Sequence, residues 1–312
     1  MINKEKNFVS AVVYVHNAEQ RIENFLKDLI NVMETNFEHS EIICVNDCSE
    51  DDSISKIKNV SSIATTTSVS VINMSYFHGL ELAMNAGADM SIGDFVFEFD
   101  NTVMDYDIDM IMKVYNRSLE GYDIVSASSN KSQKMSSAIF YKVFDMFTDL
   151  SYKMRTESFR ILSRRVINRI SSMNKTIPYR KAIYANCGLK TDNLVYEINK
   201  NVRNKEDKRE KKYRTRLATD SLILFTEVGY KFAKLMTGLM MLMSLFMIAY
   251  SLVVYVTAHP VEGWTTTIMF LSVAFFGIFG ILTVIIKYLQ ILVDLVFKRK
   301  QYSFESIEKI TR

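Results

Sequence analysis

Cysteine is scarce in this chain, which has three in 312 residues: Cys44, Cys48 and Cys187. Their number and spacing match no disulfide framework, metal site or redox motif, so we expect reduced thiols. The sequence begins Met-Ile-Asn-Lys-Glu-Lys and lacks the apolar core of a signal peptide, so the N-terminal part is expected to stay in the cytosol. Only two prolines occur, while Lys, Asn and Ile are abundant, a composition that favours an AT-rich genome.

Charge is missing from two stretches of 24 residues, 235–258 and 263–286, which contain no Asp, Glu, Lys, Arg or His. A helix that crosses a bilayer needs about 20 apolar residues, so each stretch is long enough to span it. The run that begins at Leu239 is apolar on every face, whereas a helix in a soluble core usually keeps a polar face. We predict two transmembrane helices joined by the short loop 259–262; two buried core helices are the alternative.

Basic residues are concentrated in the C-terminal part. Residues 1–199 contain 21 Lys and Arg against 26 Asp and Glu, whereas residues 200–312 contain 17 against 9. The basic half suits contact with anionic lipid headgroups, and the loop between the spans has no Lys or Arg. The positive-inside rule therefore places both chain ends in the cytosol, with the hairpin in a bacterial inner membrane or plasma membrane. The flanking basic residues are Lys231, Lys234, Lys287 and Lys298-Arg-Lys300.

Apolar runs rich in β-branched and aromatic residues alternate with segments of helical periodicity over much of the first 170 residues. This alternation predicts parallel βαβ units and an α/β fold with a doubly wound, mostly parallel sheet and helices on both faces. The expected strands are 8–15, 41–46, 69–73, 94–99 and 123–127, and the expected helices are 18–36, 79–91, 136–152 and 163–172.

Polar clusters follow three of the expected strands: His16-Asn17, Asn46-Asp47 and Asp100-Asn101-Thr102. Sheets of this kind bind ligands at the carboxyl ends of their strands, so these clusters are the best functional clue. The turn after Asp47 also contains Ser49 and Asp51, either of which can cap the next helix.

Several segments match, in order, the motifs of one enzyme family. Ala11–Glu19 resembles V-V-P-V-Y-N-E-E, Val45–Ser53 resembles V-N-D-G-S-T-D-G-S, and Ser158–Val166 resembles D-F-R-L-x-S-R-R-V. His78–Gly87, followed by Gly93-Asp94, has the family's spacing up to its D-x-D motif. From about residue 8 to residue 302, the chain thus resembles family 2 glycosyltransferases, specifically the polyprenyl-phosphate glycosyltransferases that include dolichol-phosphate mannose synthase-like enzymes.

This resemblance implies a Rossmann-like fold of the GT-A type followed by a membrane hairpin. Residues 200–216 contain nine basic and three acidic side chains, which form either a solvated face or a headgroup-binding segment. The expected organisation is a cytosolic GT-A domain (1–197), a basic amphipathic juxtamembrane segment (198–234), two transmembrane helices (235–258 and 263–286) and a cytosolic amphipathic tail (287–312).

The resemblance also implies a donor site for a nucleotide sugar. It assigns Asp47 to the base, which an ionised carboxylate can bind as a hydrogen-bond acceptor; a plain helix N-cap is the alternative for this residue. The residues implied in donor binding are Tyr14, Asn17, Glu19, Asp47, Gly79, Asp100 and Thr102.

A leaving diphosphate needs its charge neutralised, usually by Mg²⁺ or Mn²⁺ held on carboxylates. Asp100 is the expected catalytic carboxylate and metal ligand. The D-x-D motif reads Asp100-Asn-Thr102 here, so a hydroxyl replaces the second carboxylate, and Asp105 could partly compensate. Ser158 stands where the family has an aspartate, and the neighbouring Glu157 either takes a polar role in the site or is solvated.

A polyprenyl phosphate is already an anionic nucleophile, so the acceptor side needs cations that hold the phosphate rather than a strong base. Arg160 matches the family's Phe-Arg-Leu arginine and is the first candidate for this catalytic role. Lys211 and Lys212, with the tyrosine that follows them, resemble the family's S-K-Y and are the other candidates. Arg164 and Arg165 either belong to the site or decorate a surface helix.

The function that follows is transfer of one sugar from a nucleotide donor, preferably a UDP-sugar, to a lipid-linked phosphate on the cytosolic leaflet. The family expectation is inversion at the sugar, and the product would serve cell-surface glycan synthesis. A homo-oligomer is compatible with this function, and no nucleic-acid partner is expected. The main rival, motivated by Thr102, is a catalytically impaired scaffold or regulatory protein. A processive synthase or flippase is disfavoured because two spans do not enclose a glycan pathway and carry no intramembrane charge.

Overall fold

The structure is a computed structural model. It describes residues 4–130, 156–172, 180–198 and 304–311, together with isolated helical positions between residues 212 and 292. The helix expected at 136–152 lies outside the described residues, and so do both expected membrane spans except for such isolated positions. Within the described parts of the chain, no helix combines the length and apolar character needed to cross a membrane.

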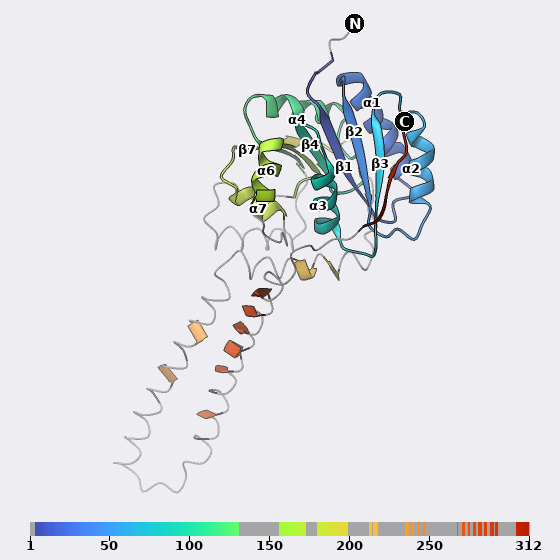
Figure 1. Cartoon of the computed structure of the whole chain (residues 1–312). Coiled ribbons are helices and arrows are strands. Elements are labelled where there is room, and N and C mark those ends of the chain that lie inside the picture. Colours follow the sequence, from blue (N-terminus) through green and yellow to red (C-terminus); the bar gives the residue numbers. More distant parts are fainter. Residues whose placement is uncertain are drawn as a thin grey trace, which may run out of the picture.

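One eight-stranded sheet forms the centre of the fold, with the strand order β7-β5-β6-β4-β1-β2-β3-β8 (Figure 1). The strands are β1 (Val9–Val15), β2 (Ser40–Asn46), β3 (Ser68–Met74), β4 (Phe95–Phe99), β5 (Ile124–Ser129), β6 (Phe159–Ser163), β7 (Thr191–Tyr196) and β8 (Phe304–Lys309). The helices are α1 (Ile22–Asn36), α2 (Ser53–Ser61), α3 (Leu80–Met90), α4 (Asp109–Leu119), α6 (Arg164–Ser172) and α7 (Arg180–Asn186).

The four strands β4-β1-β2-β3 are parallel and are linked by helices, as the alternating sequence pattern predicts. Every residue of β1 is buried, which explains why this strand is apolar on both faces, apart from Ser10, rather than alternating. All five expected strands and the helices expected at 18–36, 79–91 and 163–172 are confirmed, with shifts of a few residues at their ends.

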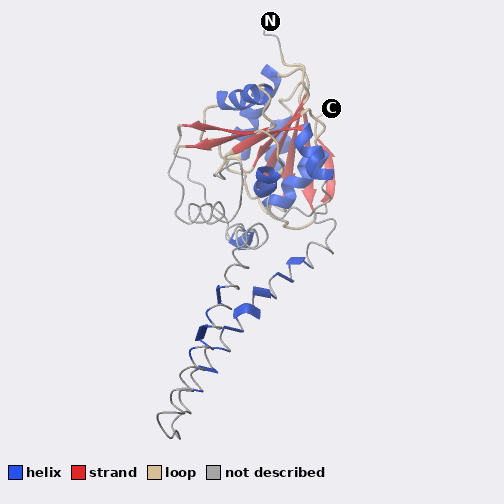
Figure 2. Ribbon diagram, turned by 90° about the vertical axis from the view of Figure 1, so that its left-hand side faces the viewer, coloured by secondary structure: helices blue, strands red, loops and turns tan. Residues whose placement is uncertain are grey.

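The two sides of the sheet carry separate hydrophobic cores. α1, α2 and α4 pack on one face, where Leu26 and Ile111 are fully buried, and α3, α6 and α7 pack on the other, around residues such as Met84 and Val166. Figure 2 shows the helices on both sides of the strands. The expectation of an α/β fold with two helical layers is therefore confirmed.

Two strands, β6 and β8, make the sheet more mixed than expected. β6 lies between β4 and β5 and is antiparallel to both, while β7 is parallel to β5. β8 comes from the far C-terminal segment and pairs antiparallel with β3, so strands more than 200 residues apart lie side by side (Figure 1). A domain boundary after residue 197 therefore leaves out one strand of the central sheet.

Candidate active site

The carboxyl ends of β1, β2 and β4 lie at one edge of the sheet, because these strands are parallel and in register. The predicted polar clusters that follow them are brought to this edge. The backbone N–H of Asp47 donates to the carbonyl of Val15 over 2.9 Å, and a ring nitrogen of His16 lies 2.8 Å from the carbonyl of Asp47. The clusters after β1 and β2 are thus in direct contact.

Asp47 is completely buried, and its carboxylate accepts hydrogen bonds from other groups of the protein. It accepts hydrogen bonds from the backbone N–H groups of His78 (2.7 Å) and Gly79 (2.8 Å) and from the hydroxyl of Tyr14 (3.0 Å). Asp47 therefore joins the end of β2 to the start of α3 and does not cap α2. Its contact with a nucleobase, and that of Tyr14, stay predictions.

Asn17 and Glu19 lie together in the loop after β1 and bind the turn before α2. Asn17 has a left-handed backbone (φ 47°), and its side-chain oxygen accepts from the backbone N–H of Glu50 over 2.9 Å. The Glu19 carboxylate accepts from the backbone N–H of Asp52 at 3.3 Å. Both side chains therefore hold the two loops together, and their contact with a donor stays a prediction.

The two expected capping residues of this turn differ in their roles. Asp51 accepts from the backbone N–H of Ser53, the first residue of α2, over 3.1 Å and from the N–H of Glu19 over 2.9 Å. Ser49 instead accepts from the backbone N–H of Asn17 over 3.1 Å. Asp51 therefore satisfies a backbone donor in the first turn of α2, whereas Ser49 only joins the two loops.

Gly79 precedes α3 with φ +85° and ψ 162°, a backbone conformation that is almost exclusive to glycine. The ring of Tyr213 covers it: a Cβ at position 79 would lie 2.3 Å from the Cζ atom of that ring. Phe77 contacts the same ring edge-on, with 6.2 Å between centroids. A residue of the basic segment thus packs on the edge of the site, next to the predicted donor residues.

Asp100 follows β4 and lies between two arginines. Its Oδ2 accepts from Nη2 of Arg160 at 2.5 Å, and its Oδ1 accepts from Nη2 of Arg180 at 2.7 Å. Arg160 is on β6, where it faces Glu98 of β4 in the strand register, and Arg180 begins α7. The structure therefore brings the two predicted catalytic residues, Asp100 and Arg160, into contact and adds Arg180.

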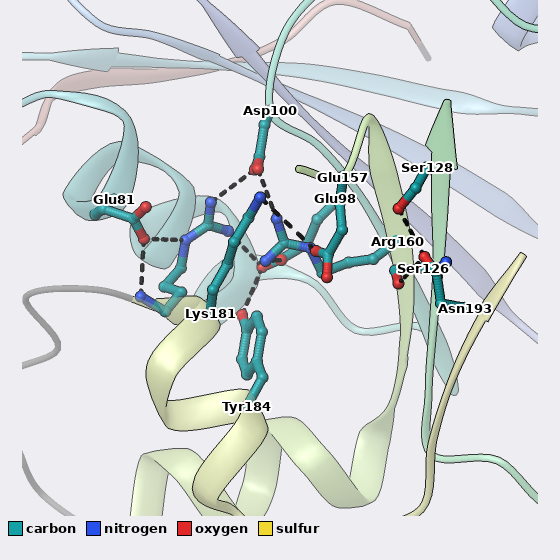
Figure 3. A network of polar contacts seen from close by, with 11 residues as sticks. Glu81, Glu98, Asp100, Ser126, Ser128, Glu157, Arg160, Lys181, Tyr184 and Asn193 are labelled. Atoms are coloured by element: carbon teal, nitrogen blue, oxygen red, sulfur yellow. Dashed lines mark hydrogen bonds and ion pairs between the residues drawn. The ribbon is translucent and has the colours of Figure 1, made fainter. Parts of the chain in front are cut away.

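Both guanidinium groups are almost fully buried and contact further carboxylates; Figure 3 shows Arg160 among these acidic side chains. Arg180 contacts Glu98 at 2.7 Å and Glu81 at 2.9 Å, and Arg160 contacts Glu98 at 3.5 Å and Glu157 at 3.3 Å. Burying a charge is costly unless partners of opposite charge surround it, which these carboxylates provide. Glu157 is thus an ion-pair partner of Arg160 with a side chain only 9% exposed, and not a solvated side chain.

Residues of α7 also contact these arginines and carboxylates. The hydroxyl of Tyr184 donates to Glu98 over 2.9 Å, and the guanidinium of Arg160 lies 5.4 Å from the centroid of the Tyr184 ring. Lys181 lies 3.9 Å from Glu157. We call the set made by Glu81, Glu98, Asp100, Glu157, Arg160, Arg180, Lys181 and Tyr184 the charge network.

The charge network keeps Asp100 ionised. Burial by itself would raise the pKa of Asp100, but the attraction of Arg160, Arg180 and Lys181 outweighs it and holds that pKa well below its usual value. Burial likewise would lower the pKa of Arg160, yet its acidic neighbours, Asp100 first among them, raise it above the ordinary arginine value. Both groups are therefore charged at every physiological pH.

Sequence reasoning missed Arg180, Glu98, Glu81, Lys181 and Tyr184. For Glu98 a signal existed, because it is the only charged residue in the apolar strand Phe95–Phe99 and a buried charge requires a partner. For Arg180 no motif was recognised, and its contact with Asp100 depends on how α7 packs.

The other residues predicted for the site make no ion pair with Asp100 or Arg160 among the contacts described. Thr102 is buried, and Asp105 accepts a hydrogen bond from the hydroxyl of Tyr196 over 2.7 Å. Lys212 is exposed at the start of a short helical stretch, whereas Lys211 lies outside the described residues. The guanidinium of Arg164 donates to the carbonyl of Gly93 and so anchors α6 to the sheet, and Arg165 is exposed. These two arginines are therefore not part of the charge network.

The residues around Asp100 do not offer a ready site for a divalent metal. Both oxygens of Asp100 are engaged by arginines, position 102 supplies only a hydroxyl, and Asp105 is bonded to a tyrosine. Across the described residues, no group of three His, Cys, Asp or Glu side chains is arranged to hold a metal ion. The metal at Asp100 stays a prediction that this donor set does not favour.

Residues 10–174, just over half of the chain, match the model of the family described as glycosyl transferase family 2. The chain belongs to glycosyl transferase family 2. This membership bears out the enzyme class expected from the motifs, a glycosyltransferase, and agrees with the strand-end site.

Three proteins of known sequence are similar to this chain. An uncharacterized glycosyltransferase of Synechocystis sp. is 27% identical over 195 residues, which are 61% of this chain and 60% of the relative. The uncharacterized glycosyltransferase YkcC of Bacillus subtilis is 27% identical over 278 residues, 86% of this chain and 84% of the relative. A prophage bactoprenol glucosyl transferase homolog of Escherichia coli is 26% identical over 196 residues, 60% of this chain and 62% of the relative. The chain therefore spans about three fifths of the first and third relatives and most of the second.

Two solved structures are similar to the chain. Mannosyl-3-phosphoglycerate synthase from Rubrobacter xylanophilus has a TM-score of 0.52 and 17% identity, covering 69% of this chain and 74% of that one. Glucosyl-3-phosphoglycerate synthase from Mycobacterium tuberculosis, in complex with Mn²⁺, UDP and glucosyl-3-phosphoglycerate, has a TM-score of 0.48 and 12% identity, covering 70% and 78%. The first of these likenesses confirms a GT-A-like α/β fold.

Proposed function

We propose that this chain transfers one sugar, glucose in the first instance, from a UDP-sugar to a polyprenyl phosphate at the cytosolic face of a membrane. The observation that carries this proposal is Asp100 at the carboxyl end of β4, held between Arg160 and Arg180. Parallel sheets of this class bind their ligands at that edge. The bactoprenol glucosyl transferase homolog named above supports glucose as the sugar and a polyprenyl carrier as the acceptor.

The proposed chemistry needs charge stabilisation more than proton transfer. The bond from the anomeric carbon to the diphosphate breaks, the nucleoside diphosphate leaves with the electron pair, and an oxygen of the lipid phosphate forms the new bond. Because that oxygen is already anionic, no general base has to remove a proton. Cations near the departing and the attacking phosphates lower the barrier, and the charge network contains three, held in place by four carboxylates.

The membrane hairpin is part of the proposal, with spans at 235–258 and 263–286 and both chain ends in the cytosol. The described positions within these ranges are helical, and several carry large apolar side chains that are well exposed to solvent. Apolar side chains exposed along a helix are typical of surfaces that contact lipid or another protein. Examples are Leu242, Phe246, Ile278 and Ile285.

The direct test is to incubate membranes containing the protein with polyprenyl phosphate and a panel of labelled UDP- and GDP-sugars. We expect a lipid-extractable product that requires both the acceptor and one UDP-sugar. Absence of product with every donor, together with absence of nucleotide-sugar binding, would favour the scaffold function that the loss of the second D-x-D carboxylate suggests.

A further inference from the structure

We propose that Arg160 and Arg180 take the place of a divalent metal at Asp100, so that the donor binds without Mg²⁺ or Mn²⁺. This inference rests on the proposed function, because it assigns the cations of that same site. Its starting point is the way in which the Asp100 carboxylate is shared between two guanidinium groups, one on each oxygen.

The two arginines bring to Asp100 the charge that a divalent ion would bring. Each is about 1% exposed, and they contact opposite oxygens of the carboxylate at 2.5 and 2.7 Å. A metal that bound Asp100 would have to displace these buried cations or lie beside them. Displacement takes one carboxylate partner from each of two buried guanidinium groups, and a dication placed beside these groups is repelled by both.

The neighbours of Asp100 already bind other groups, which leaves few free carboxylate oxygens for a metal. Magnesium takes oxygen ligands, with carboxylates among them. Thr102 is neutral, Asp105 accepts from Tyr196 at 2.7 Å, and Glu98 accepts from Tyr184 at 2.9 Å. The hydroxyl at position 102 and the two arginines at Asp100 are thus consistent with each other, because the first takes away a charged metal ligand and the second supply positive charge.

Three nitrogens of the two guanidinium groups make ion-pair contacts but no hydrogen bond within the described residues. In the part of the chain that the structure describes, Nε and Nη1 of Arg160 and Nη1 of Arg180 are buried without a hydrogen-bond partner, although carboxylates lie within ion-pair distance. Arginine presents five N–H donors in a planar fork that fits phosphate oxygens in pairs. Lys181, which has a side chain 13% exposed, adds a third positive charge near Asp100.

The test is calorimetric titration of UDP into the full-length protein in nanodiscs, once in excess EDTA and once in excess MnCl₂. We expect the two dissociation constants to agree within about twofold, and Arg180→Met to weaken UDP binding about tenfold or more, since charge-assisted hydrogen bonds are lost. Arg180→Lys, which keeps the charge and tests for misfolding, should recover part of that loss. Arg117→Met, which removes an arginine paired with Asp192 outside the charge network, is the matched control and should leave UDP binding unchanged.

Binding of Mn²⁺ alone, followed by electron paramagnetic resonance without nucleotide, gives an independent measurement. The proposal expects the same signal from the wild type and from Asp100→Asn. It is overturned if Mn²⁺ binding disappears in Asp100→Asn, or if chelation abolishes UDP binding and Mn²⁺ restores it. If UDP fails to bind under either condition, the donor assignment of the proposed function fails, while the manganese signal still decides whether Asp100 holds a metal.

Discussion

The ring of Tyr213 lies directly on Gly79, so closely that a Cβ at position 79 would come within 2.3 Å of it. This contact connects the basic segment to the first turn of α3, where Asp47 binds the backbone N–H groups. Burial raises the pKa of the Tyr213 hydroxyl above its usual range, and the charge of Glu81 adds to this effect. The Tyr213 side chain is therefore neutral, and it packs the segment that contains Lys212 against Gly79, close to Glu81 of the charge network.

Gly79→Ala should destabilise the protein in two ways. The backbone conformation at this position costs a non-glycine residue on the order of 1–3 kcal/mol, and the new methyl group also displaces the Tyr213 ring. In a Tyr213→Ala background only the backbone cost remains, so the same substitution should lower the free energy of unfolding less. Chemical denaturation of the four proteins of this double-mutant cycle measures the difference. Equal effects in both backgrounds would mean that the ring does not pack on Gly79.

Glu98 is expected to be essential for the stability of the charge network. It is fully buried and contacts Arg180, Tyr184 and Arg160. Glu98→Gln leaves two buried guanidinium groups short of a negative charge, which should lower the free energy of unfolding by about 3–5 kcal/mol. The control is Glu120→Gln, which removes an exposed partner of Arg117 and should cost less than about 1 kcal/mol. Similar losses for the two variants would contradict the network.

Acid should remove the stability that Asp100 contributes. Its pKa is lower in the folded than in the unfolded protein, because Arg160, Arg180 and Lys181 outweigh burial. The contribution is therefore fully present above about pH 5, where an unperturbed Asp is ionised, and is lost as the pH falls toward the folded-state value. Asp100→Asn lacks this group, so its melting temperature should lie below that of the wild type at neutral pH. The gap should narrow between about pH 5 and about pH 3; a gap that stays constant would show that Asp100 is not ion-paired.

The strand β8 should stabilise the catalytic domain although it comes from the end of the chain. It covers the edge of β3, and Asn73 of β3 donates to the hydroxyl of Ser306 over 2.9 Å. Deleting residues 304–312 exposes the unpaired N–H and C=O groups of β3, so a lower melting temperature and aggregation are expected. Lys58→Ala removes only the exposed ion pair with Glu308 and should have little effect. A truncated protein as stable as the wild type would show that β8 is dispensable.

The parallel half of the fold could be predicted because its signals are local. Buried parallel strands are continuous apolar runs, and the periodicity of the helices between them is visible in the sequence. β6 and β8 carry no such signal of their partners. Arg160 lies in β6, and the sequence does not show that this strand is inserted antiparallel between β4 and β5. Pairing between distant segments is decided by tertiary packing, which local patterns do not contain.

The site could be predicted only in part, because motifs are local whereas contacts between distant segments are not visible in the sequence. Asp100 and Arg160 were found from motifs, and the structure brings them together. The contact of Asp47 with a nucleobase stays a prediction; its hydrogen bonds to the backbone at the start of α3 were not foreseen from the sequence. Arg180 has no sequence signal, since its contact with Asp100 requires α7 to lie against β4 and β6.

The most direct test of the account is the amount of labelled sugar transferred from UDP-glucose to polyprenyl phosphate by the wild type, by Asp100→Asn and by Asp28→Asn. Asp28 is an exposed residue of α1 and serves as the matched control. We expect Asp28→Asn to retain wild-type activity and Asp100→Asn to lose it by at least about a hundredfold, the usual scale for loss of a positioned charged group. Transfer by Asp100→Asn at the wild-type rate would contradict the central claim that this carboxylate and its two arginines form the active site.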